Sequence, residues 1–375
     1  MNRAGHYEMV PLGIASYKAY IPSSLPPLPE IEMDAELISL LGKAHNVLGQ
    51  LESTSKLLPN VKLFLGSYVR KEALLSSQIE GTQATLEDVL NSEVTAAVNL
   101  EVDDVINYVG ALNFAIQKME SLPICNRLLC ETHRVLLQGV RGQDKNPGEF
   151  RRSQNWIGAA GSTLQNARYI PPTPENMLIC MGELEKFIHE SELDILIKTS
   201  LVHYQFETIH PFLDGNGRIG RMLIILMLMN ERVLSSPILY MSLFLKTNRI
   251  EYYDRLSEVR NKGNYEQWIK FFLQGVITTC EDSIFTIEQI HKIMDEDVVK
   301  IQKDTDTVKA VFAYLKEHPI VNIGGTAKAL GMAFNTVSTA LKKLSAAGIV
   351  EEKTTKSRDR IFEYSRYLNI LKSGT

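Results

Sequence analysis

Apolar residues recur at helical spacing along most of the chain, and this periodicity limits the fold more than any other feature. In one stretch, Ile38, Leu41, Leu48 and Leu51 lie on one face of an expected helix. The same spacing predicts helices near residues 69–80, 85–91, 101–119, 125–138, 174–190, 193–209, 218–232 and 250–294. The fold class is therefore expected to be mainly α, with a helical bundle over roughly residues 30–295.

One interval of this body does not fit a helix. Residues 148–174 carry glycines, prolines and short apolar patches, which favour a β-hairpin flap. Trp156 lies on this segment, where it would either contact a partner or only fasten the hairpin.

The C-terminal part differs from the body in charge and in pattern. The net charge is −4, yet residues 305–375 hold eleven Lys and Arg against six Asp and Glu. Helices are expected at 305–317, 324–331 and 333–347, followed by strands at 349–352 and 360–364. This order predicts a winged helix-turn-helix domain.

That module is expected to bind either DNA or protein. The recognition helix would begin with Asn335, Thr336 and Ser338, and the basic wing would carry Lys353, Lys356, Arg358 and Arg360. Duplex DNA bound through 305–375 is thus one expected partner, and protein docking through the same module is the other.

Several features point to the cytoplasm. No run approaches the ~20 uncharged apolar residues that a membrane-spanning helix needs. The N-terminus lacks the apolar core of a signal peptide. The four cysteines (Cys125, Cys130, Cys180 and Cys280) show no zinc or redox spacing and are expected to be free thiols. We expect a cytoplasmic protein with no membrane partner.

A polar, glycine-rich turn between two apolar helices carries the clearest chemistry. It reads HPFLDGNGRIGR over residues 210–221. Gly215, Asn216 and Gly217 open the second helix, and backbone N–H groups at a helix N-terminus bind phosphate oxygens. Arg218 and Arg221 reach the same side of the first helical turn, where paired guanidinium groups suit a polyphosphate.

Two further residues complete a transfer site. Asp214 can hold Mg²⁺ that bridges the phosphates. His210 ends the preceding helix and is the candidate general base for a hydroxyl nucleophile. An anion cradle, a metal, cationic clamps and a base are the parts that phosphoryl or nucleotidyl transfer needs.

A rival interpretation fits part of the same turn. Residues 215–220 match G-x-G-x-x-G, the dinucleotide-binding fingerprint. That fingerprint follows a strand, whereas residues 204–210 have helical period and a long apolar helix comes next. We therefore disfavour a dinucleotide site, and no G-x-x-x-x-G-K-[ST] pattern supports a P-loop.

The chain resembles the Fic-domain proteins, whose signature HxFx[DE]GNGRxxR is met at every position from His210 to Arg221. Residues 149–151 and 169–172 resemble the family's flap, and residues 252–268 resemble its helices after the motif. The likeness covers most of residues 30–280, and is strongest to bacterial members with a C-terminal winged helix. It implies a Fic-type helical bundle with a β-hairpin flap. The expected domains are an N-terminal helical region over 1–100, a catalytic core over 101–295 and a winged helix over 296–375.

The resemblance implies transfer of AMP from ATP, with Mg²⁺, onto a Ser, Thr or Tyr hydroxyl of a target protein docked along the 148–172 flap. His210 would deprotonate the acceptor, and Asp214 would bind the metal. The nucleotide site would comprise Asp214, Gly215, Asn216, Gly217, Arg218, Ile219, Gly220 and Arg221, with Tyr252 lining the adenine pocket. The chain itself and a second copy of it are further candidate partners.

Other outcomes stay open on this evidence. Some members of the family transfer other phosphate-linked groups, and some remove AMP. A different class of function is a DNA-binding regulator whose body only senses a nucleotide. That alternative gives His210 no task, and so an autoinhibited protein adenylyltransferase is favoured.

A second segment resembles the family's inhibitory motif, [ST]xxxE[GN], at Ser76, Glu80 and Gly81. Glu80 comes in the last turn of a helix ended by Gly81, where the helix dipole disfavours a carboxylate. A nearby cation would compensate for this. In the resembled arrangement Arg221 is that cation, so the inhibition would be intramolecular.

Two more histidines are expected to be structural. His203 lies two turns before His210 on the same helix, and His133 shares an apolar face with neighbouring leucines. Both are expected to be packed core residues rather than bases or ligands.

Overall fold

The computed structural model describes residues 2–12, 15–56, 61–91, 99–159, 161–353 and 360–372. Its helices are α1 (Ala35–Lys56), α2 (Val61–Ile79), α3 (Leu86–Asn91), α4 (Leu100–Lys118), α5 (Asn126–Leu136), α6 (Pro174–Glu190), α7 (Ile195–Ile209), α8 (Asn216–Asn230), α9 (Met241–Thr247), α10 (Arg249–Lys262), α11 (Tyr265–Lys300), α12 (Asp306–Glu317), α13 (Ile323–Leu330), α14 (Phe334–Ala346) and α15 (Ser365–Lys372). Its strands are β1 (Gly5–Leu12), β2 (Ala15–Pro22), β3 (Ile320–Asn322), β4 (Glu351–Glu352) and β5 (Ile361–Glu363).

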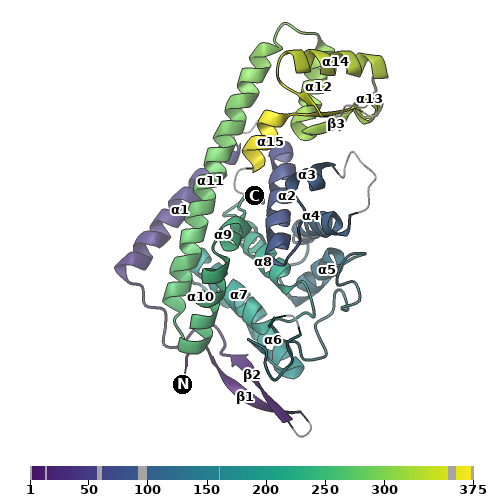
Figure 1. Cartoon of the computed structure of the whole chain (residues 1–375). Helices are drawn as coiled ribbons and strands as arrows, with labels where there is room; N and C mark the ends of the chain where they lie inside the picture. Colours follow the sequence, from purple (N-terminus) through teal and green to yellow (C-terminus); the bar gives the residue numbers. More distant parts are fainter. Residues whose placement is uncertain are drawn as a thin grey trace.

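Helices α7 and α8 form the centre of the bundle (Figure 1). Every residue of α7 from Leu196 to Ile209 is buried, and α8 is buried from Asn216 to Leu228. A helix that is buried on all sides needs neighbours on all sides. Helices α2, α4 and α5 contact α8, while α6 and α11 contact α7. The predicted mainly helical bundle is confirmed.

The long helix α11 runs from the base of the bundle to the C-terminal module, with α1 packed along it (Figure 1). The prediction of one helix over 250–294 was wrong. Gly263 takes a left-handed conformation, with φ of 71°, and ends α10 before α11 begins at Tyr265. Helix α9 was not predicted.

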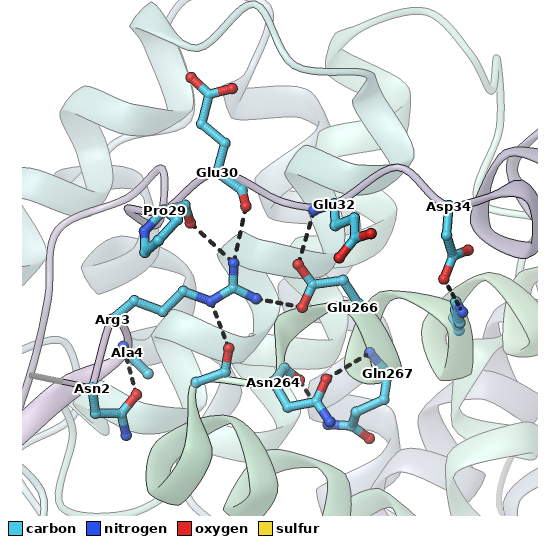
Figure 2. A network of polar contacts seen from close by, with 12 residues as sticks. Asn2, Arg3, Ala4, Pro29, Glu30, Glu32, Asp34, Asn264, Glu266 and Gln267 are labelled. Atoms are coloured by element: carbon cyan, nitrogen blue, oxygen red, sulfur yellow. Dashed lines mark hydrogen bonds and ion pairs between the residues drawn. The ribbon is translucent and has the colours of Figure 1, made fainter.

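An N-terminal antiparallel hairpin, β1–β2, was also not predicted. Figure 2 shows how Arg3 fastens it to the turn between α10 and α11. The Arg3 guanidinium donates to the Gly263 carbonyl at 2.7 Å and pairs with Glu266. The backbone N–H of Tyr20 on β2 then donates to the Ile170 carbonyl at 2.9 Å, which joins this hairpin to the flap.

The flap itself is less regular than the predicted hairpin. Within the described part of 148–174, a single antiparallel bridge joins Ile157 to Tyr169, and turns fill the space between them. The flap also contacts residues outside it, as in the small apolar cluster of Tyr17 and Ala19 with Ile170.

The C-terminal module contains α12, α13 and α14 with a three-stranded sheet in the order β3–β5–β4. Strand β3 and helix α15 were not predicted. Helix α15 packs back on α11 and α2, and one continuous apolar core joins the module to the body. Helix α11 crosses residue 296, the expected domain boundary, without a break. None of the helices in the described ranges is long and apolar enough to span a membrane.

Candidate active site

The predicted motif loop connects the two central helices. His210 follows α7 in the left-handed conformation, with φ of 51°, and Gly215, with φ of 76°, precedes α8. The Asn216 side chain closes the loop, because its Oδ1 accepts from the Phe212 N–H and its Nδ2 donates to the Phe212 carbonyl, both at 2.8 Å. The side chain of Asn216 is therefore structural, and the first N–H groups of α8 are left to an anion.

His133 of α5 packs against this loop and bonds to it. Its ring stacks on Phe212 with centroids 3.8 Å apart. The Gly148 N–H donates to Nδ1 at 2.9 Å, so the proton is on Nε2, which donates to the Asp214 carbonyl at 3.0 Å. Burial lowers the pKa of His133 to about 4, which keeps the ring neutral. His133 is a core residue, as predicted, and it also positions Asp214, which the sequence did not indicate.

His210 has the protonation state of a base. Burial lowers its pKa to about 4, although the charge of Glu80 opposes that shift. Its Nδ1 faces the Glu207 carbonyl at 3.4 Å. A carbonyl only accepts, so this contact favours the proton on Nδ1 and leaves the lone pair of Nε2 free to take a proton.

The buried Arg151 ties the flap to the same loop. Its Nε donates to the His210 carbonyl at 3.0 Å, its Nη2 donates to the Pro172 carbonyl, and its own N–H donates to the Pro211 carbonyl at 2.9 Å. Burial lowers its pKa to about 10, so the guanidinium stays charged at neutral pH. The residue was predicted only as part of the flap. Its contact with His210 is a long-range feature that no local pattern reveals.

The structure brings together Ser76, Glu80 and Arg221. The Arg221 Nη2 donates to Glu80 Oε1 and to the Ser76 carbonyl, both at 2.9 Å, and its Nε donates to Ser76 Oγ at 2.8 Å. A Cβ at Gly217 would collide with Glu80 Oε1, so this carboxylate lies directly on the first turn of α8. Burial raises the pKa of Glu80, but the Arg221 guanidinium, together with the weaker effects of Arg218 and His210, holds that pKa below its usual value.

Gly81 follows Glu80 with φ of 104°, a conformation that only glycine adopts readily. The chain can therefore turn away from α8 immediately after the carboxylate, toward the start of α3.

Arg218 lies on the side of the site formed by α4, opposite Glu80. Its Nη1 is 3.7 Å from Asp104 Oδ1 on α4, and its Nη2 is 3.6 Å from Asp214 Oδ1. Neither contact is short enough for a good hydrogen bond. Asp104 was not predicted, because it comes from a helix about a hundred residues before the motif.

Asp214 suits a divalent cation of the magnesium type. Its Oδ1 accepts from the Gly215 N–H at 2.6 Å, and a Cβ at Gly142 would come within 2.9 Å of Oδ2. Magnesium in nucleotide sites uses one or two carboxylates and takes its other ligands from phosphates and water.

Other predicted site residues lie deeper. Tyr252 is buried, and its hydroxyl is 2.9 Å from His203 Nε2, so the structure does not favour it for an open adenine pocket. His203, whose Nδ1 is 2.9 Å from the Gly220 carbonyl, is a packed residue as predicted. Gly220 itself allows α7 to approach, because a Cβ there would collide with Glu207.

Ile219 is also buried in the core. The half-buried Tyr253, next to Tyr252, lies within the electrostatic reach of Glu80 and Arg221. It is a better candidate than Tyr252 for contact with a ligand.

Fold and loop together define the class: a helical protein in which a glycine-rich helix start carries two arginines and follows a neutral histidine. Family models agree with this class. The Fic/DOC family N-terminal model matches residues 38–117, and the Fic/DOC family model matches residues 123–228. The chain is a Fic/DOC family protein.

Curated relatives are distant and much longer. The protein adenylyltransferase Fic of Drosophila ananassae is 31% identical over 175 residues, which are 46% of this chain and 31% of that protein. The protein adenylyltransferase Fic of Drosophila persimilis is 27% identical over 253 residues, which are 64% of this chain and 45% of that protein. The chain thus spans less than half the length of these relatives.

Solved structures share the fold. A Fic family protein from Desulfovibrio desulfuricans G20 matches with a TM-score of 0.60 and 18% identity, over 89% of this chain and 97% of that one. Fic-1 of C. elegans matches with a TM-score of 0.51 and 18% identity, over 67% of this chain and 72% of that one.

Proposed function

We propose that the protein transfers AMP from ATP, with Mg²⁺, to a Ser, Thr or Tyr hydroxyl of a target protein, and that Glu80 restrains this activity. One observation carries the proposal. A single motif of twelve residues joins a neutral histidine to a helix start that already holds a carboxylate. That helix start binds anions, and the histidine is free to accept a proton.

The chemistry follows from these positions. His210 Nε2 takes the proton of the acceptor hydroxyl as its oxygen attacks the α-phosphorus. The bond from that phosphorus to the oxygen bridging to the β-phosphate breaks, and pyrophosphate leaves. Arg218 and Arg221 hold the leaving phosphates, and the N–H groups that begin α8 hold the oxygens of the phosphate that is attacked. Mg²⁺, when bound through Asp214, neutralises phosphate charge.

Inhibition follows from the place of Glu80. Its carboxylate occupies the first turn of α8 and takes two partners that a nucleotide needs, the helix start and Arg221. A phosphate group and this carboxylate repel each other and compete for the same donors. ATP therefore binds productively only after Glu80 moves away.

The flap is the proposed docking site for the target. Trp156 and Ile157 are exposed on it, although Trp156 Nε1 also donates to the Ser162 carbonyl at 2.9 Å. The indole thus fastens the flap and leaves one face open to a partner. Because Arg151 joins the flap to His210, a target lying there would present its hydroxyl near the base.

The C-terminal module has the element order of a winged helix, and we propose that it docks on protein. Two of the predicted basic wing residues are neutralised within the chain, Lys353 by Glu351 and Glu363 and Arg360 by Glu352. Lys356 and Arg358 lie outside the described residues. Paired cations attract DNA phosphates weakly, which disfavours the DNA interpretation. A second copy of the chain is one candidate partner.

The direct test uses ATP labelled on its α-phosphate and, separately, on its γ-phosphate. We expect the full chain carrying Glu80→Gly to place only the α-label on itself or on proteins of a cell extract. Adding His210→Ala should reduce labelling by ~10²–10⁴-fold. His189→Ala, a change at an exposed histidine of α6, should have no effect.

The pH profile of this reaction has a defined direction. The base must be neutral, and the folded pKa of His210 is about 4, so the rate should hold as the pH falls below 6.5 and drop only near pH 4. Covalent γ-label would indicate phosphoryl transfer instead. No covalent label, with nucleotide still bound, would favour the sensor alternative.

A further inference from the structure

The wall of the site opposite Glu80 has a carboxylate that the proposed chemistry does not use. Asp104 comes from the first turns of α4 and is buried. Its Oδ1 accepts no hydrogen bond from the described residues, and the Nε of buried Arg218 likewise finds no partner there. A buried donor and a buried acceptor left unsatisfied so close together are costly, and they indicate a site that a ligand completes.

Arg218 lies between two carboxylates at nearly equal distances, 3.7 Å to Asp104 and 3.6 Å to Asp214. Asp214 precedes Arg218 by four residues, just before α8, so the two side chains lie within reach of each other. They do not pair closely, because Asp104 attracts the guanidinium from the other side.

The position of Arg218 between the two carboxylates affects how readily Asp214 can bind a cation. A carboxylate that is tightly paired with an arginine is a poor ligand, because the metal must first displace the arginine. In this structure the Asp214 carboxylate accepts a short bond from the Gly215 N–H and lies 3.6 Å from the Arg218 guanidinium, and its Oδ2 faces Gly142. Asp104 thereby keeps Asp214 available.

We propose that Asp104 is a positioning residue that tethers Arg218 away from Asp214, so that Asp214 can bind the divalent cation of the nucleotide while Arg218 takes the phosphates. This inference rests on the proposed function as far as it assumes a metal–nucleotide complex. Asp104 itself makes no contact with the reacting atoms. Burial raises the pKa of Asp104, and the charges of Arg218 and Arg141 oppose that shift.

The test measures binding of Mg²⁺·ATP by calorimetry in the full chain carrying Glu80→Gly. Asp104→Asn keeps the shape and removes the charge. We expect the Kd to rise about tenfold, which corresponds to about 1.4 kcal/mol, and the Mg²⁺ concentration for half-maximal binding to rise with it. Asp103→Asn, a change at the partly exposed neighbour on the same turn, should alter the Kd by less than about twofold. Asp104→Glu, which restores the carboxylate, should recover most of the affinity.

A double-mutant cycle separates this role from a structural one. If Asp104 acts through Arg218, Asp104→Asn should change nothing further once Arg218→Ala is present. A loss that persists in that background overturns the proposal, and so does an Asp104→Asn protein that binds like Asp103→Asn.

The same measurements separate the inference from the proposed function. A parent protein that binds Mg²⁺·ATP without transferring AMP contradicts only the function, whereas a parent that binds no Mg²⁺·ATP contradicts both.

Discussion

Arg221 and Arg218 leave the same first turns of α8, three residues apart, yet α2 and α4 hold them in different ways. On the α2 side, Arg221 donates three hydrogen bonds, two to Ser76 and one to Glu80. On the α4 side, Arg218 lies beyond good hydrogen-bond distance of both Asp104 and Asp214. One arginine is fully engaged by the protein, and the other is left ready for a ligand.

In the proposed function, this difference means that restraint by Glu80 acts on only one half of the phosphate site. Glu80 is the more movable partner of the pair, because its side chain is 42% exposed. Arg221 cannot leave, since its side chain is only 1% exposed and Ser76 also holds it. The movable part of the restraint is therefore the carboxylate end of α2, and the clamp itself stays in place.

We expect the largest effect from removing Arg221, the arginine that Ser76 and Glu80 engage. Arg221→Ala removes the anchor of Glu80 and a phosphate clamp together, so it should not resemble loss of the inhibition. We expect AMP transfer to fall by about 10²–10³-fold, measured against Glu80→Gly in initial rates of label incorporation. The double variant should be as inactive as Arg221→Ala alone. Arg127→Ala, a change at an exposed arginine of α5 outside the flap, serves as the control. An active double variant would show that Arg221 anchors Glu80 but does not bind phosphate.

Removing the Glu80 carboxylate from Arg221 should have a smaller effect, of the opposite sign. Glu80→Gly is expected to raise the rate of AMP transfer at fixed Mg²⁺·ATP by about tenfold or more, since it removes about 1.4 kcal/mol of competition for the helix start. Glu80→Gln keeps the helix and the shape but loses the charge, so it should raise the rate less. Both variants should melt slightly below the wild-type protein. Rates equal to wild type in both would mean that Glu80 is an ordinary residue at a helix end.

The α2 and α4 sides of α8 also show what a sequence can and cannot predict. The position of the loop before α8 was predicted because the motif lies in twelve consecutive residues, and the contact of Glu80 with Arg221 was predicted because its motif is also local. The nucleotide-binding roles of these residues stay predictions. Asp104, and the bonds from Arg151 and His133 to the loop, were missed. Each reaches the site from a distant element, and only the packing of α4, α5 and the flap against α8 brings them together.

The fold follows a similar rule. Helical periodicity predicted most of the bundle, but it could not predict the left-handed Gly263 that divides α10 from α11. Nor could it predict the β1–β2 hairpin, whose order depends on the bonds of Arg3 to the α10–α11 turn.

The smallest expected effect concerns the chain just beyond the restraint. Lys372 at the end of α15 pairs with Glu87 of α3, six residues after Gly81, and α12 and α15 also contact α2. The C-terminal module thus holds both α2 and the segment that follows Glu80. Lys372→Ala should loosen this segment only slightly, because both side chains are partly exposed and such a pair contributes about 0.5 kcal/mol. That energy corresponds to a rise of about twofold in the rate of AMP transfer, with little change in melting temperature.

Exchanging the charges of the Lys372–Glu87 pair provides a control for this small effect. Lys372→Glu alone should activate slightly more than Lys372→Ala, because it places like charges together. Combining it with Glu87→Lys should return the rate to the wild-type value. In the Glu80→Gly background none of these changes should matter, since the carboxylate that they help to hold is gone. A rate that responds to Lys372 even without Glu80 would show that the module acts on the site by another route. That result would end the simple picture in which one side of α8 is regulated and the other is not.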